Sequence, residues 1–375
     1  MTKFPAIDMA GALRLTRQGR LKEAVALLRG KPNRPPLRPK TDEAPLASKS
    51  AALHFIDDAL KGALGSLTQL DTGRFLRDPF THTGKKPAQE TPDGSRFERR
   101  SFANEAGSRK YKLFIPGGYR GQDIPLVVML HGCTQSPDDF AAGTRMNTLA
   151  EDQTFLVAYP EQARSANISK CWNWFNTANQ TRDHGEASII AGITRQIMQD
   201  FSVRPGRVYI AGLSAGGAAA AIMGSAYPEL YAAIGVHSGL ACGAASDLPS
   251  AMSAMKHGAA APLPGKTDGP AHVVPTIVFH GDKDTTVNIA NAHQVIAQSK
   301  AAANLQTAIT EGETGGVRYT RTVMSAGHRP DVLEEWVLHG AGHAWSGGSA
   351  AGSYTAPHGP DASREMIRFF FQQPA

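Results

Sequence analysis

The sequence contains little cysteine, no long apolar run and no recognisable signal segment. Three of its 375 residues are cysteine, which is too few for the disulfide framework of a small secreted domain. No apolar run approaches the roughly 20 residues that a membrane-spanning helix needs. The first residues lack the charged and then apolar layout of a signal peptide. Taken as it stands, the sequence predicts a cytoplasmic protein with no membrane span.

The pairing of the three cysteines is open at this stage. A chain of 375 residues is long enough to fold around a hydrophobic core without disulfide bonds. We therefore expect three free thiols, at Cys133, Cys171 and Cys242, and a Cys171–Cys242 bridge is the alternative.

Charge and histidine spacing exclude two further classes of partner. The formal net charge is +6 and the pI is near 9.2, with basic residues concentrated in the N-terminal third. No aromatic-interleaved basic stripe accompanies them, so we expect no nucleic-acid partner. The histidines lack zinc-binding spacing, and His-Glu-x-x-His does not occur. We accordingly expect neither a metal ion nor an organic cofactor.

The first 104 residues differ from the rest of the chain. Helical spacing of apolar residues over 9–30 and 48–67 predicts two amphipathic helices, joined by a Pro-rich linker over 31–45. Residues 70–104 are polar and predict irregular structure outside the catalytic sheet. We expect an N-terminal extension over 1–104 that packs on its own domain or on a second subunit. Docking of this extension on a polymer or granule surface is the more specific alternative hypothesis.

From residue 105 to 375 the pattern is typical of a single α/β domain. Strands are expected at 109–116, 125–131, 155–160, 208–213, 232–238, 276–281, 318–325 and 332–339, and helices at 139–152, 184–201, 215–227, 289–302 and 362–372. This alternation predicts a mainly parallel sheet with helices on both faces. Inserts at 172–183 and at about 244–272 interrupt it, and the second is a candidate lid.

The hexapeptide Gly212-Leu213-Ser214-Ala215-Gly216-Gly217 lies between an expected strand and an expected helix. In this context G-x-S-x-G is typical of a nucleophile elbow, a sharp turn that presents a reactive serine. Side chains at Gly212 and Gly216 would clash with the neighbouring strand and helix. We therefore expect Ser214 to be a nucleophile.

A nucleophilic serine needs a base and an orienting carboxylate, which follow it in this architecture in the order Ser, Asp/Glu, His. Asp284 follows an expected strand, three residues past the His-Gly pair, where the loop can turn its carboxylate inward. We expect Asp282 to brace that loop. His343 lies in a Gly-rich loop before the last helix, and its competitor His339 lies at a strand end. We expect Asp284 and His343 to complete a triad with Ser214.

An oxyanion hole is expected from two backbone N–H groups. One belongs to Ala215, directly after the serine, and the other to the loop after an early strand. The segment His131-Gly132-Cys133 ends the apolar strand at 125–131. We choose the Cys133 N–H as the second donor.

These segments resemble the poly(3-hydroxybutyrate) depolymerase-type esterase family of the α/β-hydrolase superfamily, which also contains feruloyl and acetylxylan esterases. The resemblance covers roughly residues 105–372. It rests on these motifs in order: Leu130-His131-Gly132-Cys133-Thr134-Gln135, Cys171-Trp172-Asn173-Trp174-Phe175, the Ser214 hexapeptide, His280-Gly281-Asp282-Lys283-Asp284 and Gly342-His343-Ala344-Trp345.

The resemblance implies an α/β-hydrolase fold, the same triad and hole, and substrate contacts from Trp172, Trp174 and Trp345. It implies hydrolysis of poly(3-hydroxybutyrate) or a similar short-chain polyester or oligoester through an acyl-enzyme. Feruloyl or acetylxylan-type ester hydrolysis is the alternative within the family. A serine peptidase and a non-catalytic binding protein are less favoured alternatives. Members of the family are often secreted, which differs from the cytoplasmic location expected from the N-terminus.

Overall fold

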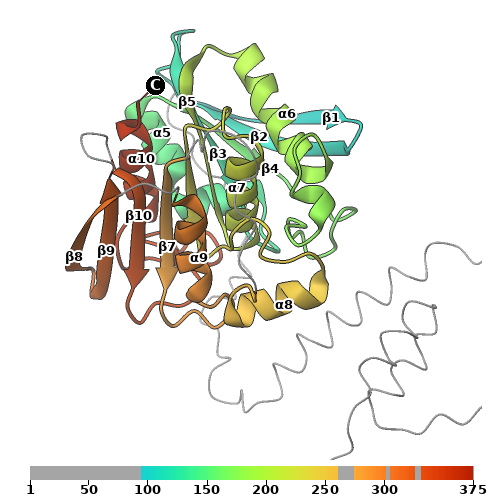
Figure 1. The fold of residues 1–375 in the computed structure, drawn as a ribbon. Helices are drawn as coiled ribbons and strands as arrows, with labels where there is room; N and C mark the ends of the chain where they lie inside the picture. The colour runs from blue at the N-terminus through green and yellow to red at the C-terminus, as the bar shows by residue number, and fades with distance from the viewer. Residues whose placement is uncertain (1–93, 261–273, 301–304, 326–330, 375) are drawn as a thin grey trace, which may run out of the picture. The chain divides into compact units, whose positions relative to one another are not determined.

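The computed structural model describes residues 94–260, 274–300, 305–325 and 331–374 (Figure 1). The expected N-terminal helices and their linker, and the second half of the candidate lid, lie outside these residues.

One ten-stranded sheet organises the described residues, in the order β1-β2-β4-β3-β5-β6-β7-β10-β9-β8. Its strands are β1 (Arg96–Asn104), β2 (Gly107–Ile115), β3 (Ile124–Leu130), β4 (Leu156–Pro160), β5 (Val203–Leu213), β6 (Ala233–His237), β7 (Thr276–Gly281), β8 (Gln306–Thr314), β9 (Val317–Ser325) and β10 (Asp331–Leu338). The six central strands, from β4 to β10 in the sheet order, are parallel to one another. Antiparallel strands flank them at both edges. A separate two-stranded sheet pairs β11 (Trp345–Ser346) with β12 (Thr355–Ala356).

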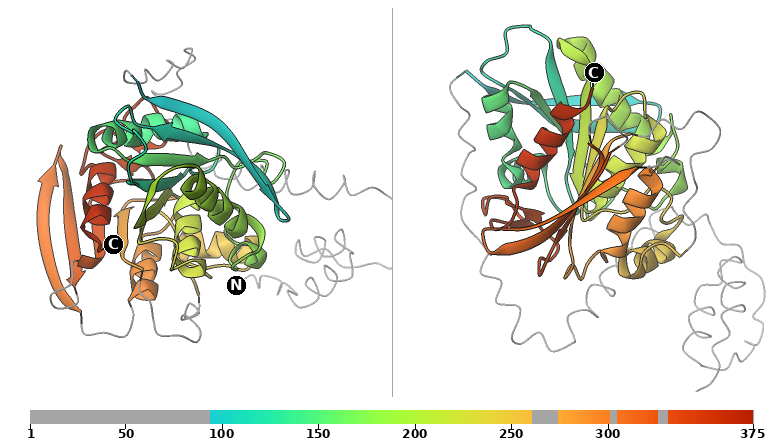
Figure 2. Two further views of the ribbon diagram at one scale, coloured as in Figure 1. Left: turned by 90° about the horizontal axis from the view of Figure 1, so that it is seen from above. Right: turned by 60° about the vertical axis from the view of Figure 1, so that its left-hand side comes forward.

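Helices cover both faces of the large sheet (Figures 1 and 2). One core contains side chains of α6 (Gly185–Asp200), α7 (Ala215–Ala226), α8 (Leu248–His257) and α9 (Ala290–Ser299). The second core contains side chains of α4 (Pro137–Thr144), α5 (Met146–Gln153) and α10 (Ala362–Gln372), and the 3₁₀ turn η1 (Thr177–Asn179) lies before α6. The prediction of a mainly parallel sheet with helices on both faces is confirmed.

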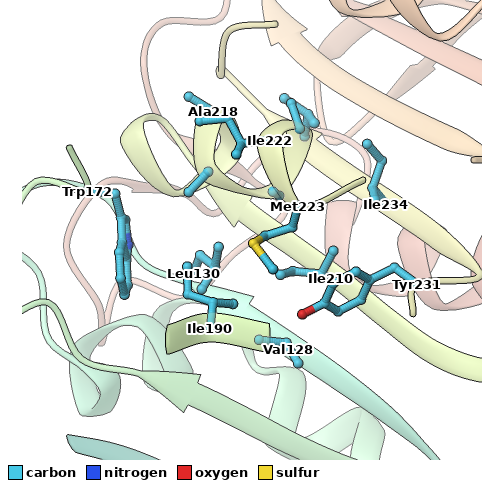
Figure 3. Close-up of a cluster of buried hydrophobic side chains, with 14 of the residues drawn as sticks. Val128, Leu130, Trp172, Ile190, Ile210, Ala218, Ile222, Met223, Tyr231 and Ile234 are labelled. Atoms are coloured by element: carbon cyan, nitrogen blue, oxygen red, sulfur yellow. The ribbon is translucent and has the colours of Figure 1, made fainter. Parts of the chain in front are cut away.

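Strands β3 and β4 are nearly continuous apolar runs, because both of their faces are buried. In β3, Val128 and Leu130 belong to the core under α6 and α7, whereas Val127 and Met129 belong to the core under α5 and α10. Figure 3 shows part of the first core, with Val128 and Leu130 close to Ile190 of α6. Full burial of such a side chain stabilises the fold by about 1.5–3 kcal/mol.

Side-chain caps fix where several helices begin. Ser136, Asp247 and Asp361 each accept a hydrogen bond from the backbone N–H of the third residue of the helix that follows. Such a cap satisfies one of the N–H groups that a helix start leaves unpaired. The helix expected over 139–152 is two helices, because Arg145 takes a left-handed conformation (φ 54°) between α4 and α5.

The interpretation of residues 70–104 as irregular is wrong for its last part, since Arg96–Asn104 forms the edge strand β1, paired along its whole length with β2. Phe97 and Phe102 of this strand pack against opposite cores. The edge strand β8 was also not expected, because Gln306–Thr314 is polar and mostly exposed. None of the helices in the described residues is both long and apolar enough to cross a membrane.

Candidate active site

The candidate nucleophile, acid and base follow the carboxyl ends of three parallel strands. Ser214 comes after β5, Asp284 after β7 and His343 after β10. These strands lie in the order β5-β6-β7-β10 and all run in the same direction (Figure 1). Their carboxyl ends therefore meet at one edge of the sheet, which is where open α/β sheets hold their sites.

Ser214 occupies a strained turn between β5 and α7. Its backbone has φ 58° and ψ −119°, a combination that costs a non-glycine residue about 1–3 kcal/mol and is concentrated at functional sites. A Cβ atom on Gly216 would collide with the carbonyl oxygens of Leu130 and His131, and one on Gly212 would collide with the Gly216 carbonyl. Glycine is required at both positions, and the Ser214 side chain stays partly exposed while its neighbours are buried.

Asp284 and His343 form a hydrogen-bonded pair. The distance from His343 Nδ1 to Asp284 Oδ2 is 2.7 Å. The other carboxylate oxygen accepts hydrogen bonds of 2.8 Å from the backbone N–H groups of Thr286 and Val287. Burial alone would raise the pKa of Asp284, but the hydrogen bonds from His343 and Val287 outweigh it and hold that pKa below its ordinary value. Asp284 is therefore ionised and can orient the His343 imidazole.

The competing pair, Asp282 and His339, joins two loops. Asp282 accepts hydrogen bonds from the Gly340 N–H at 2.7 Å and contacts His339 Nδ1 at 3.0 Å. The other ring nitrogen of His339 lies 2.9 Å from Thr320 Oγ1. Both nitrogens of His339 are thus engaged away from Ser214, which agrees with the bracing role expected for Asp282.

A second imidazole, that of His237, holds the loop that follows His343. The His237 ring stacks against Trp345 and Phe279, with centroids 5.1 and 5.8 Å away. Its Nε2 accepts a 3.0 Å hydrogen bond from the Ser346 N–H, so this nitrogen carries no proton. Burial, with the nearby His280 and His343, lowers the pKa of His237 to about 3. His237 is a neutral structural group and was not expected from the sequence.

The loop after β3 leaves one N–H group available for an oxyanion. Gly132 N donates to Gln135 Oε1 (2.9 Å), and Thr134 N donates to the carbonyl of Ser169 (2.7 Å). Within the described residues no protein acceptor is found for the Cys133 N–H between them. Ala215, the other expected donor, is the first residue of α7, where the N–H has no partner inside the helix.

The expectation of three free thiols is wrong, and so is the alternative Cys171–Cys242 bridge. Cys133 and Cys171 form a disulfide, and Cys242 is free. The bridge joins the loop after β3 to the loop between β4 and α6. A weak signal of this pairing is present in the sequence, because Cys133 and Cys171 both belong to the motifs that carry the family resemblance, whereas Cys242 does not.

Trp172, Trp174 and Trp345, expected as substrate contacts, lie in the protein interior. Their exposed fractions are 1%, 6% and 0%. Trp172 Nε1 donates to the His131 carbonyl at 3.1 Å, and Figure 3 places its ring beside the buried cluster. Trp345 Nε1 donates to Ser363 Oγ at 3.0 Å. Their contacts position the loops around the site, and the role in substrate binding stays a prediction.

These contacts predict the effect of replacing Trp172. Trp172→Ala should lower the free energy of unfolding by about 3–5 kcal/mol and reduce turnover of small and bulky esters in the same proportion. Trp172→Phe should keep most of the packing but leave the His131 carbonyl unpaired, at a cost of about 1–3 kcal/mol. Urea unfolding and two esters of different size measure both effects. A stable alanine variant with a selective loss on bulky esters would instead identify Trp172 as a substrate contact.

His131 links the same loop to the segment after β4. Its Nδ1 lies 2.7 Å from the Gly132 carbonyl, and its Nε2 accepts a 3.1 Å hydrogen bond from Gln162 N–H. The imidazole is therefore neutral and protonated on Nδ1. Complete burial lowers the pKa of His131 to about 4, because burial disfavours the charged imidazolium.

The lowered pKa of His131 predicts acid sensitivity. Because the pKa is about 4 in the folded protein and about 6.5 in an unfolded chain, the unfolded state binds more protons between these values. The contribution of neutral His131 to the free energy of unfolding, about 3 kcal/mol, is complete above pH 6.5 and is lost as the pH falls to 4. Urea unfolding at several pH values should show a shallower loss for His131→Asn. An identical pH dependence in both proteins would contradict this.

The family model described as "Esterase PHB depolymerase" matches residues 109–322, more than half of the chain. The chain belongs to this family. Poly(3-hydroxyalkanoate) depolymerase C of Paucimonas lemoignei is 30% identical to it over 252 residues, which are 65% of this chain and 60% of that protein. Acetylxylan esterase of Coprinopsis cinerea is 30% identical over 162 residues, 43% of this chain and 42% of that protein. The match thus spans less than two thirds of either relative.

Solved structures with a similar fold are also esterases or related hydrolases. An acetyl xylan esterase from Aspergillus awamori aligns with a TM-score of 0.57 at 19% identity, covering 73% of this chain and 99% of that one. An S-formylglutathione hydrolase from Agrobacterium tumefaciens aligns with a TM-score of 0.50 at 14% identity, covering 77% and 99%. At such low identity the likeness establishes the fold, and the expected α/β-hydrolase fold of this esterase-family member is confirmed.

Proposed function

We propose that this member of the esterase family hydrolyses carboxylic esters by a two-step acyl transfer, with Ser214 as nucleophile. The observation that supports this most directly is the 2.7 Å hydrogen bond between His343 and Asp284 at the edge where the strained Ser214 turn lies. A binding module has no need for an ionised carboxylate, an oriented imidazole and a serine on an elbow together.

His343 takes the Ser214 proton as Oγ bonds to the ester carbonyl carbon, and Asp284 keeps the imidazole oriented and stabilises its positive charge. The Cys133 and Ala215 N–H groups donate to the oxyanion of the tetrahedral intermediate, each contributing about 3–4 kcal/mol to the stabilisation of the transition state. His343 then gives the proton to the departing alcohol. Water repeats the sequence on the acyl-enzyme and releases the acid, with His343 again as the base.

A short-chain polyester such as poly(3-hydroxybutyrate), or its oligoesters, is the substrate that we propose. The similarity to a poly(3-hydroxyalkanoate) depolymerase, which extends over 252 residues, favours this class. The shorter match to an acetylxylan esterase makes acetyl or feruloyl esters of polysaccharides the second candidate.

The disulfide changes the compartment that we favour. Cytoplasmic thiols are kept reduced, whereas disulfides persist in oxidising compartments. Because Cys133 and Cys171 are bridged beside the site, we propose that the protein works in an oxidising compartment, in place of the cytoplasm expected from the sequence.

The test measures release of soluble 3-hydroxybutyrate from amorphous poly(3-hydroxybutyrate), with p-nitrophenyl butyrate in parallel and Ser214→Ala as the control. Loss of both activities in the variant, and labelling of Ser214 by a fluorophosphonate, would support a polyester-cleaving serine esterase. Turnover of the small ester alone would turn the search to acetylated xylan and feruloyl esters. Activity that persists in Ser214→Ala would refute the mechanism.

A further inference from the structure

Large apolar side chains are exposed at four positions of the described residues. They are Ile168 (54% exposed), Met252 (38%), Ile309 (67%) and Tyr354 (48%). Single exposed apolar residues are ordinary on a protein surface. Ile168 and Tyr354 differ, because both lie next to the loop that carries the Cys133 N–H.

Thr134, the residue after Cys133, contacts the segments of both side chains. Its N–H donates to the carbonyl of Ser169, the neighbour of Ile168, at 2.7 Å. On the other side its Oγ1 lies 3.4 Å from the Tyr354 hydroxyl. The two exposed side chains therefore flank the same loop, and together we call them the Ile168–Tyr354 rim.

The backbone of Tyr354 is held in a conformation that a tyrosine seldom adopts. Its φ is 53°, in the left-handed region that is unfavourable for a bulky residue. Its carbonyl accepts a 2.8 Å hydrogen bond from Trp345 N–H, two residues beyond His343. The preceding residue, Ser353, is fixed by hydrogen bonds to Asp139 and Gln135. Tyr354 therefore keeps a strained backbone and a half-exposed ring, with contacts to Thr134 of the Cys133 loop and to Trp345 of the segment after His343.

A structural role does not explain this arrangement, because an exposed ring adds little to the core while its backbone strain costs stability. The position of Tyr354 beside the Cys133 loop explains the exposed ring better. A substrate whose carbonyl oxygen lies at the Cys133 N–H is next to Thr134, which contacts Ser169 on one side and Tyr354 on the other. Exposed apolar surface beside the reacting centre gains free energy when an apolar chain covers it.

We propose that the Ile168–Tyr354 rim is a binding site for the apolar chain of the ester, and that it selects aliphatic polyesters over polysaccharide esters. The inference rests on the ester hydrolysis proposed above. Tyrosine alone could pack against either a sugar ring or an alkyl chain. Ile168 offers only aliphatic C–H groups, which a hydroxylated sugar does not complement but the pendant methyl and backbone methylene groups of poly(3-hydroxybutyrate) do.

The kinetic test compares p-nitrophenyl octanoate with p-nitrophenyl acetate in the full-length protein. Ile168→Ala and Tyr354→Ala should each lower kcat/KM for the octanoate about tenfold more than for the acetate. Tyr354→Phe keeps the ring and loses only the hydroxyl contact with Thr134, so it should retain the preference for the long chain. Ile309→Ala is the matched control, because Ile309 is equally apolar, is exposed, and lies on the edge strand β8.

A second measurement reads binding without turnover. In the Ser214→Ala background, adsorption to amorphous poly(3-hydroxybutyrate) particles and to insoluble xylan is compared with and without Tyr354→Ala. Adsorption to polyester that weakens several-fold in the rim variants, but not in Ile309→Ala, would support the proposal. Equal losses on octanoate and acetate, or preferential adsorption to xylan, would overturn it. A failure of the esterase mechanism itself would be seen separately, because Ser214→Ala would then hydrolyse esters at the wild-type rate.

Discussion

Asp284→Asn is expected to lower kcat for ester hydrolysis by about 10⁴-fold, with the fold intact. The substitution is nearly isosteric, and the surrounding hydrogen bonds determine how the new amide is oriented. Oδ1 of Asp284 accepts two hydrogen bonds, from the backbone N–H groups of Thr286 and Val287. An asparagine must direct its oxygen toward these donors, because its NH₂ group cannot accept a hydrogen bond.

The NH₂ group of the asparagine then faces His343 Nδ1, which lies 2.7 Å from Asp284 Oδ2 in the wild type. Nδ1 becomes an acceptor, so the imidazole is held with its proton on Nε2. In that tautomer His343 cannot take the Ser214 proton, and the positive charge that forms during the reaction loses its carboxylate partner. Both effects act on kcat more than on KM.

Asp282→Asn is the matched control, since Asp282 is a neighbouring carboxylate that also pairs with a histidine, His339. Its replacement should loosen the two loops and leave kcat within about tenfold of the wild type, because neither residue contacts the His343–Asp284 pair. Steady-state kinetics with p-nitrophenyl butyrate and circular dichroism of both variants measure the difference. A larger kcat loss in Asp282→Asn than in Asp284→Asn would contradict the orienting role that we give to Asp284.

Residues tied to backbone geometry were predictable from the sequence. The Ser214 turn needs glycine at 212 and 216, and the structure shows carbonyl groups where their side chains would be. β7 and the second half of β5 are mostly apolar and buried, and β10 is buried for most of its length although it carries two glutamates. The ends of these strands could therefore be located within a few residues. Chain order and parallel pairing then bring the three loops to one edge.

Features that depend on tertiary contacts were not predictable. The burial of Trp172 depends on helices α6 and α7 packing over it, and a sequence pattern does not distinguish a buried tryptophan from a ligand contact. The edge strand β1 has one phenylalanine against each core among mostly polar residues, and β8 is polar and mostly exposed, so neither shows a clear apolar alternation. Cysteine connectivity depends on which loops meet in space, and spacing alone does not determine it.

Loss of the Cys133–Cys171 bridge is expected to lower the free energy of unfolding by about 4 kcal/mol, the chain-entropy value for a closed loop of this length. The bridge spans a sequence separation of 38 residues. Cys133→Ala and Cys171→Ala remove the same bond from opposite ends, and the double variant leaves no unpaired thiol at either position. All three should therefore show the same loss in urea unfolding and the same moderate loss of activity.

The comparison of Cys133→Ala with Cys171→Ala distinguishes a role of the Cys133 side chain from a role of its backbone N–H. If Cys133 acts on the substrate through its N–H, alanine at 133 keeps the donor, and its kcat matches that of Cys171→Ala. Proline at 133 removes the N–H as well, and should lower kcat by a further 10²–10³-fold, roughly the effect of losing one oxyanion donor. Thermal unfolding shows whether Cys133→Pro is as stable as Cys133→Ala.

Two outcomes would contradict these assignments. A Cys133→Ala variant far less active than Cys171→Ala would mean that the sulfur itself takes part in catalysis. A folded Cys133→Pro variant with the same activity as Cys133→Ala would place the second donor elsewhere in the loop.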